Sequence, residues 1–87
     1  MAMSLREQFT TKTALEVLER SGAQGCQEDT LFTLVELKID SILSSIEKRA
    51  LLKTLLEKQW VYTYNDPITG NKRFAITEDG TLTAHAL

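Results

Sequence analysis

The sequence predicts a small α+β domain in which three principal helices precede a β-hairpin and a short final helix. Two observations support this prediction. Apolar residues recur at spacings of three and four through much of residues 13–59, which is typical of helices packed on a core. Residues 55–80 then read as a helix end, a strand, a tight turn, a second strand and a helix start. A helix that leads into a hairpin and then into another helix forms the C-terminal half of a winged helix.

The first helix is delimited by capping signals. Residues 4–7 and residues 13–16 both have capping-box form. We expect the better helix to run from Thr13 to Arg20, with Gly22 available as its left-handed cap. Threonines are poor helix-interior residues, and the three that precede or begin this helix predict a break. They are Thr10, Thr11 and Thr13.

A second helix is expected over roughly Thr30–Lys38, and Asp40 or Ser41 can cap a third helix that extends to Gln59. The third region has two apolar clusters on nearly opposite sides, whereas a straight surface helix shows one. Either the helix begins later, at the capping box that starts with Ser44, or a longer helix buries one side against a partner. The first apolar cluster comprises Ile42, Leu43, Ile46 and Ala50, and the second comprises Leu51, Leu52, Leu55 and Leu56.

The hairpin is predicted from strand-forming residues around a concentrated turn. Residues 61–64 are β-branched or aromatic, which suits a pleated, half-buried surface. Residues 65–71 supply the turn. Pro67 presets φ, Asp66 can bond its own backbone, and Gly70 can adopt a positive φ.

The chain is expected to return as a second strand over residues 72–76 and then to enter a helix. Glu78 and Asp79 follow Thr77, and carboxylates in a first helical turn interact favourably with the helix dipole. We therefore expect a short terminal helix from about Glu78 to Ala86.

The length of 87 residues indicates one domain over residues 1–87, with a flexible or short helical N-terminal arm over residues 1–11. No apolar run approaches the roughly 20 residues that span a bilayer, and the N-terminus lacks the apolar segment of a secretory signal. The single cysteine, Cys26, excludes an internal disulfide and a cysteine-rich zinc site. The sequence predicts a reduced, cytoplasmic protein without a metal or another cofactor.

Charge is distributed unevenly, although the net charge of −2 is small. Residues 1–40 have four basic and seven acidic side chains, whereas residues 41–87 have six basic and five acidic ones. The half that would touch nucleic acid in a winged helix therefore has a weak positive bias. It is far from the strongly basic footprint of many DNA-binding domains.

From Leu52 onward the chain resembles winged helix-turn-helix regulators of the MarR and PadR type. In that family the recognition helix ends in a pattern like L-x-x-L-x-x-K-G-L-V, followed by a charged strand, a D-P-x-x-G-x-x-R turn and an L-T-x-x-G segment. The resemblance covers about a third of the chain and implies a winged-helix fold and transcription regulation. The matching residues are Leu52, Leu55, Lys58, Trp60, Val61, Asp66, Pro67, Gly70, Arg73, Ile76, Thr77 and Gly80.

The chain departs from the family pattern in three places. Gln59 stands where the recognition helix usually ends in glycine, and about four residues, one helical turn, are extra between Asp40 and Leu52. Base-reading helices are typically rich in Arg, Asn and Gln. The corresponding part of this helix instead offers Ser44, Ser45, Glu47 and Lys48.

The resemblance implies that the third helix lies in the major groove of double-stranded DNA and that the wing reaches phosphate or the minor groove. The implied role is a small transcriptional regulator or a phage- or plasmid-type accessory DNA binder. Lys53 is less favoured as a contact because it lies farther along the helix. The candidate DNA contacts are Ser44, Ser45, Lys48 and Arg49 on the helix and Thr69, Asn71, Lys72 and Arg73 in the wing.

Two alternatives to DNA binding follow from the same residues. The cations of the third helix can form a solvated face that pairs with Glu47 and Glu57 at helical spacing. A winged helix can also act as a protein-interaction or dimerisation module, because fold does not determine function. In that case the first apolar cluster is the contact surface, and otherwise it belongs to the core. A homodimer is expected through this cluster or through the two terminal segments, since the family usually pairs two-fold.

Catalysis is not expected of this chain. His85, the only histidine, has no carboxylate partner evident in the sequence, and Cys26 has no histidine near it. No phosphate-binding loop, metal-ligand spacing or nucleophile elbow occurs.

Overall fold

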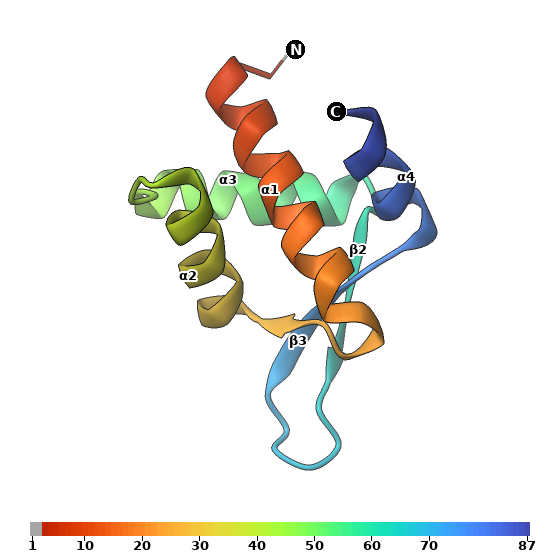
Figure 1. Ribbon diagram of the computed structural model, residues 1–87. Coiled ribbons are helices and arrows are strands. Elements are labelled where there is room, and N and C mark those ends of the chain that lie inside the picture. Colours follow the sequence, from red (N-terminus) through yellow and green to blue (C-terminus); the bar gives the residue numbers. More distant parts are fainter. Residues whose placement is uncertain (1–2) are drawn as a thin grey trace.

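Four α-helices, one 3₁₀ turn and a three-stranded sheet make up residues 3–87, the part of the chain that the computed structural model describes. The elements in chain order are α1 (Leu5–Ser21), η1 (Gly22–Gln24), β1 (Cys26–Gln27), α2 (Glu28–Ile39), α3 (Ser45–Glu57), β2 (Val61–Asn65), β3 (Lys72–Ile76) and α4 (Glu78–Ala86). Helix α1 crosses in front of α3, and the β2–β3 hairpin projects from the helices as a wing (Figure 1). The first turns of α1 and the end of α4 lie at the opposite end of the molecule from the wing.

A single core joins the helices to the sheet, with α1 in contact with α2, α4 and β3. Trp60, just before β2, is half-buried and packs against this core. Each large apolar side chain that is removed from water contributes about 1.5–3 kcal/mol to the free energy of folding. The largest fully buried side chains are Leu15, Leu18, Leu31, Val35 and Leu55.

The structure contains a strand that the sequence did not predict. Strand β1 pairs antiparallel with β3, with Cys26 opposite Phe74, so the sheet has the order β1-β3-β2. A two-residue strand is too short to show an alternating pattern, so it leaves no periodic signal in the sequence. Gly25 lies directly before it with φ of 64°, and an added Cβ would be 2.0 Å from the carbonyl oxygen of Phe74. Glycine is therefore required for this close approach.

The predicted break at the threonines is wrong, because α1 runs without interruption from Leu5 to Ser21. Most of the expected N-terminal arm therefore belongs to α1, while residues 1 and 2 lie outside the described part of the chain. Ser4 caps the helix by accepting a hydrogen bond from the Glu7 N–H (3.1 Å). Thr13 Oγ1 donates to the Phe9 carbonyl oxygen (2.7 Å), which satisfies a hydroxyl inside the helix. All three threonines, at positions 10, 11 and 13, are buried, so packing overrides their low helix propensity.

The later start of the third helix is confirmed. Ser44 caps α3 in a complete capping box with Glu47, and α3 ends at Glu57. The proposal that Asp40 or Ser41 caps this helix is wrong. Asp40 instead ends α2 with a left-handed backbone (φ 54°), and its N–H donates to the Glu36 carbonyl oxygen. The chain between the two helices is therefore a separate five-residue turn, residues 40–44.

The hairpin and the last helix lie within one residue of their predicted bounds. Strands β2 and β3 pair antiparallel with Val61 opposite Ile76. Helix α4 begins after Thr77, whose hydroxyl oxygen accepts a hydrogen bond from the Gly80 N–H (3.0 Å). A Cβ at Gly80 would be 2.1 Å from the Trp60 carbonyl oxygen. This contact between α4 and the start of the hairpin explains the glycine of the L-T-x-x-G pattern.

Candidate nucleic-acid interface

The predicted serine contacts of α3 differ in their surroundings. The Ser44 hydroxyl accepts a hydrogen bond from the Glu47 N–H (3.1 Å), and the Ser44 N–H donates to Glu47 Oε1 (3.1 Å). Ser44 therefore has a structural role at the N-terminus of α3. Ser45 and Arg49, four residues apart and on one side of the helix, are exposed to solvent.

The two lysines of α3 lie in different environments. Lys48 is half-buried, and its Nζ lies 5.5 Å from the centre of the Phe32 ring of α2. A cation–π interaction at this distance contributes about 0.5–1 kcal/mol. Lys53 is exposed and lies one turn beyond Arg49, with its Nζ 3.9 Å from Glu57 Oε1. Lys53 was expected to be too far along the helix to contact DNA, but the structure places it on the same exposed side of α3 as Arg49.

An ion pair connects α1 to the first turn of α3. Arg6 Nε lies 2.7 Å from Glu47 Oε2, and Arg6 Nη2 donates to Ser41 Oγ (3.2 Å) and to the Ile42 carbonyl oxygen (3.4 Å). The hydrogen bond from Arg6 and that from the Ser44 N–H lower the pKa of Glu47 to about 2. The same contact raises the pKa of Arg6. The carboxylate at the N-terminus of α3 is thus ionised and compensated by an arginine.

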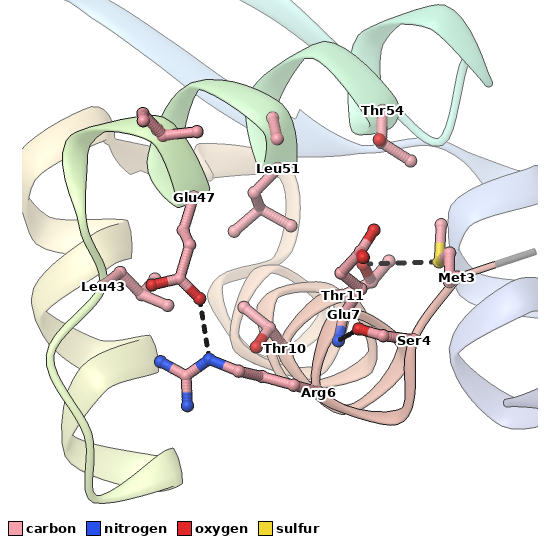
Figure 2. Close-up of a pocket in the computed structure, with 12 residues that line it drawn as sticks. Met3, Ser4, Arg6, Glu7, Thr10, Thr11, Leu43, Glu47, Leu51 and Thr54 are labelled. Atoms are coloured by element: carbon pink, nitrogen blue, oxygen red, sulfur yellow. Dashed lines mark hydrogen bonds and ion pairs between the residues drawn. The ribbon is translucent and has the colours of Figure 1, made fainter.

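The Arg6–Glu47 pair spans a groove of about 310 Å³ between the N-terminal half of α1 and α3 (Figure 2). Threonine hydroxyls and apolar side chains share its walls, and Figure 2 shows Thr10 and Leu51 between the two helices. The groove brings the start of α1 beside the helix expected to read DNA. Its lining residues are Met3, Ser4, Arg6, Glu7, Thr10, Thr11, Leu43, Ile46, Glu47, Ala50, Leu51 and Thr54.

The tip of the wing is organised by the Asp66 carboxylate. Asp66 Oδ1 accepts hydrogen bonds from the N–H groups of Ile68 (2.8 Å) and Thr69 (3.2 Å), and Oδ2 accepts from Arg73 Nε (3.1 Å). The two backbone N–H groups are the main reason that the pKa of Asp66 lies below its ordinary value. One ionised side chain therefore fixes both the backbone of the turn and an arginine of the returning strand.

The four predicted wing contacts divide into one structural residue and three exposed ones. Arg73 is half-buried, and besides Asp66 its Nη1 contacts the carbonyl oxygens of Gln24 (3.5 Å) and Gly25 (3.4 Å). It thereby joins the turn of the wing, through Asp66, to the segment before β1. The three exposed residues are Thr69, Asn71 and Lys72, and Thr69 Oγ1 accepts a hydrogen bond from the Asn71 N–H (3.3 Å).

The first apolar cluster is split by the structure. Leu43 is core, with 3% of its surface exposed, whereas Ile42 (85%) and Ile46 (79%) are largely exposed, as is Ala50. The cluster is therefore neither wholly core nor wholly surface, and each of the two interpretations is wrong for part of it. The reason is the turn before Ser44, which points neighbouring side chains in opposite directions.

The residues considered for catalysis have structural partners. His85 Nε2 lies 3.1 Å from Glu19 Oε2, so the expectation that His85 has no carboxylate partner is wrong. Cys26 is buried, with its Sγ 3.0 Å from Ser21 Oγ. Within residues 3–87 no group of three or more His, Cys, Asp or Glu residues is placed to hold a metal ion.

The sequence gives no sign of the ion pair between Arg6 and Glu47. Glu47 lies 41 residues further along the chain, and no spacing rule connects positions so far apart. The Asp66–Arg73 pair has a visible signal. Opposite charges on either side of a hairpin turn commonly meet across the strands.

Comparison with solved structures identifies the fold as a winged helix, which confirms the predicted architecture. F-93 of SSV1 is 22% identical, with 88% of this chain aligned to 79% of that chain and a TM-score of 0.71. F93 from STIV, described as a winged-helix DNA-binding protein, is 17% identical over 99% of this chain and 86% of that chain, also with a TM-score of 0.71.

A third similar structure is a mutant of MepR from a multidrug resistant S. aureus clinical isolate. It is 20% identical, covers 95% of this chain and has a TM-score of 0.68, and this chain spans about half of that one (54%). The sequence matches no family model and no curated protein sequence. Among residues 3–87 no helix has the length and apolar character needed to cross a membrane.

Proposed function

We propose that this chain is a small DNA-binding protein that acts as a transcriptional regulator, with α3 in the major groove and the wing over the neighbouring backbone. The charge arrangement of α3 and the wing supports this most directly. Arg49, Lys53 and Lys72 are exposed there, while the carboxylates of Glu47 and Asp66 are each compensated by an arginine. The local surface is therefore more positive than the net charge of −2 suggests.

The structure suggests different roles for the candidate contacts. Ser45 and Arg49 are exposed on α3 and would reach base edges or the backbone. Lys53 is also exposed but lies 3.9 Å from Glu57 Oε1, so it would have to exchange this ion pair for a phosphate. Lys72, Asn71 and Thr69 are exposed in the wing and would contact phosphate oxygens. Ser44, Lys48 and Arg73 would chiefly position these groups, because each already has a partner within the protein.

Binding to a mixed-sequence duplex across a salt series tests this proposal. Affinity should fall as salt rises, and Lys72→Ala should reduce the slope of log K against log salt by about one unit. Lys12→Ala is the matched control, used with ultracentrifugation to show that the oligomeric state is unchanged. Its Nζ bonds the Leu87 carbonyl oxygen (2.9 Å) at the end of the molecule opposite the wing, away from the proposed DNA contacts, so with an intact assembly the slope should not change (Figure 1). Absence of binding by the unmodified protein even at low salt would refute DNA binding.

The exposed side chains of Ile42 and Ile46 favour a second candidate, a protein-interaction module without DNA affinity. The same salt series separates the two functions. An interaction module would bind no duplex. If its partner covers the turn before α3, replacement of Lys72 would not change the affinity for that partner.

We further propose a homodimer formed at the end where α1 begins and α4 ends. Leu5 (84% exposed) and Phe9 (54%) lie on α1, Leu82 (64%) lies on α4, and Leu87 (41%) directly follows α4. The Lys12–Leu87 hydrogen bond joins the helices there. Pairing through this end leaves α3 and the wing of both copies open to DNA, whereas pairing through Ile46 would cover α3.

A further inference from the structure

The most exposed large apolar side chain of residues 3–87 is Ile68, at the tip of the wing, with 93% of its surface accessible. It follows Pro67 and precedes Thr69, and no apolar neighbour covers it within the described chain. Burying such a side chain is favourable by about 1.5–3 kcal/mol. Its place at the end of a projecting hairpin makes it available to whatever the wing contacts (Figure 1).

The backbone that presents Ile68 is fixed by hydrogen bonds on both sides. The Ile68 N–H donates to Asp66 Oδ1 (2.8 Å), and the Gly70 N–H donates to the Asp66 carbonyl oxygen (2.7 Å). The Asp66 N–H donates to the Asn71 carbonyl oxygen (2.8 Å), and Arg73 holds the other carboxylate oxygen. Because these bonds order the turn in advance, little conformational entropy remains to be lost when Ile68 is buried by a ligand.

We propose that Ile68 is an apolar wedge that enters the minor groove of bound DNA and partly separates two stacked base pairs. This inference rests on the proposed DNA binding and adds a specificity-determining residue to it. Isoleucine between base steps kinks a duplex by roughly 20–90° toward the major groove. The exposed neighbours Thr69, Asn71 and Lys72 supply a hydroxyl, an amide and a cation for the phosphates that flank such a step.

The chemistry of the tip favours the minor groove. With α3 in the major groove, the groove next to it on the same side of the duplex is the minor one. Isoleucine has no hydrogen-bonding group to read base edges, so it recognises a step by how readily that step opens. Pyrimidine–purine steps such as TA and CA unstack at the lowest cost. Ile68 therefore makes this protein prefer a flexible step at a fixed distance from the α3 contacts, with no direct bond to the bases there.

The test uses duplexes of equal length in which a single TA step is moved along an otherwise constant sequence. The unmodified chain should bind one position of the step most tightly, and fluorophores at the two duplex ends should approach each other as the DNA bends. Ile68→Ala should weaken binding at that position by roughly tenfold and abolish both the position dependence and the bend. Ile68→Leu, which keeps an apolar wedge, should retain them.

Three controls make the result specific. Ile42→Ala removes another exposed isoleucine (85%) outside the wing and should leave the bend unchanged. Lys72→Ala should weaken binding to all the duplexes alike and keep the preferred position. Because Ile68 is almost fully exposed, Ile68→Ala should melt at the same temperature as the unmodified protein.

Several results would overturn the wedge. If Ile68→Ala binds and bends DNA as the unmodified chain does, the wedge is absent while DNA binding stands. If replacing the thymines of the step by uracil abolishes the preference, Ile68 instead contacts thymine methyl groups from the major groove. If the unmodified chain binds no duplex at low salt, DNA binding itself fails and the wedge falls with it.

Discussion

Gln59 adopts a left-handed backbone (φ 59°) at the end of α3, where the family pattern has glycine. A residue with a β-carbon is strained by about 1 kcal/mol or more in this region. Glycine removes this strain but also increases the conformational entropy of the unfolded chain, which offsets part of the gain. We expect Gln59→Gly to raise the free energy of unfolding by about 0.5–1 kcal/mol and the melting temperature by about 2–8 °C. A thermal melt followed by circular dichroism measures this change.

Asp40 provides the matched control, because it is the other non-glycine residue with a positive φ (54°) within residues 3–87. Aspartate tolerates the left-handed region better than most residues, since its short side chain bonds locally. Asp40→Gly should therefore stabilise the protein less than Gln59→Gly. Destabilisation by Gln59→Gly would mean that the glutamine side chain contributes more than its backbone strain removes.

The link between α1 and α3 should depend on pH through Glu47. Its pKa is about 2 in the folded chain against an ordinary value of 4.5, so its stabilising effect is complete above about pH 4.5 and is lost as the pH falls through 2. Arg6→Gln should raise the pKa of Glu47 toward its ordinary value and weaken this acid dependence. The Ser44 N–H still bonds the carboxylate, so the return should be incomplete.

Titration of the Glu47 carboxyl by nuclear magnetic resonance measures this pKa directly. Arg49→Gln is the control, because it removes an exposed cation of α3 that is not bonded to Glu47. Both ends of the Arg6–Glu47 pair are accessible to solvent, so added salt should also weaken it. An unchanged pKa in Arg6→Gln would show that the capping box alone lowers it.

Elements with a local signal were predicted well. The hairpin, the Ser44 cap and α4 are encoded within a few neighbouring residues, in turn formers and capping side chains. The continuity of α1 was not predicted, because Thr10, Thr11 and Thr13 have low helix propensity and only their burial makes a continuous helix favourable. Strand β1 was missed because its pairing with β3 has no local pattern.

For the molecule as a whole, the proposed dimer predicts opposite effects of two exposed substitutions. Phe9→Asp should convert a dimer to a monomer in analytical ultracentrifugation, because it places a charge in the terminal apolar surface. Ile46→Asp should leave the dimer intact and weaken DNA binding, since it adds a negative charge to α3. Ile46 is largely exposed, so Ile46→Asp should keep the free energy of unfolding to within about 0.5 kcal/mol of the unmodified protein. Phe9→Asp should melt lower than the dimer, because it loses the stabilisation that dimer formation provides, but should remain folded.

The reverse pattern would assign the dimer to α3 instead. If Ile46→Asp produced monomers and Phe9→Asp did not, the terminal surface would be excluded. Unfolding by Ile46→Asp would contradict its observed exposure of 79%.

The sequence by itself determined the order of the four helices and the hairpin, and with it the winged-helix fold, because apolar spacing, caps and turn residues act over a few positions. Strand β1 lies outside this, since its pairing with β3 has no local pattern. Only the tertiary structure decided which charged groups are engaged. Arg6 meets Glu47, and Arg73 joins Asp66 to the chain before β1, when distant elements pack together. Packing likewise buried Leu43 and exposed Ile46. Such pairings depend on how whole elements meet in space, which no local pattern specifies.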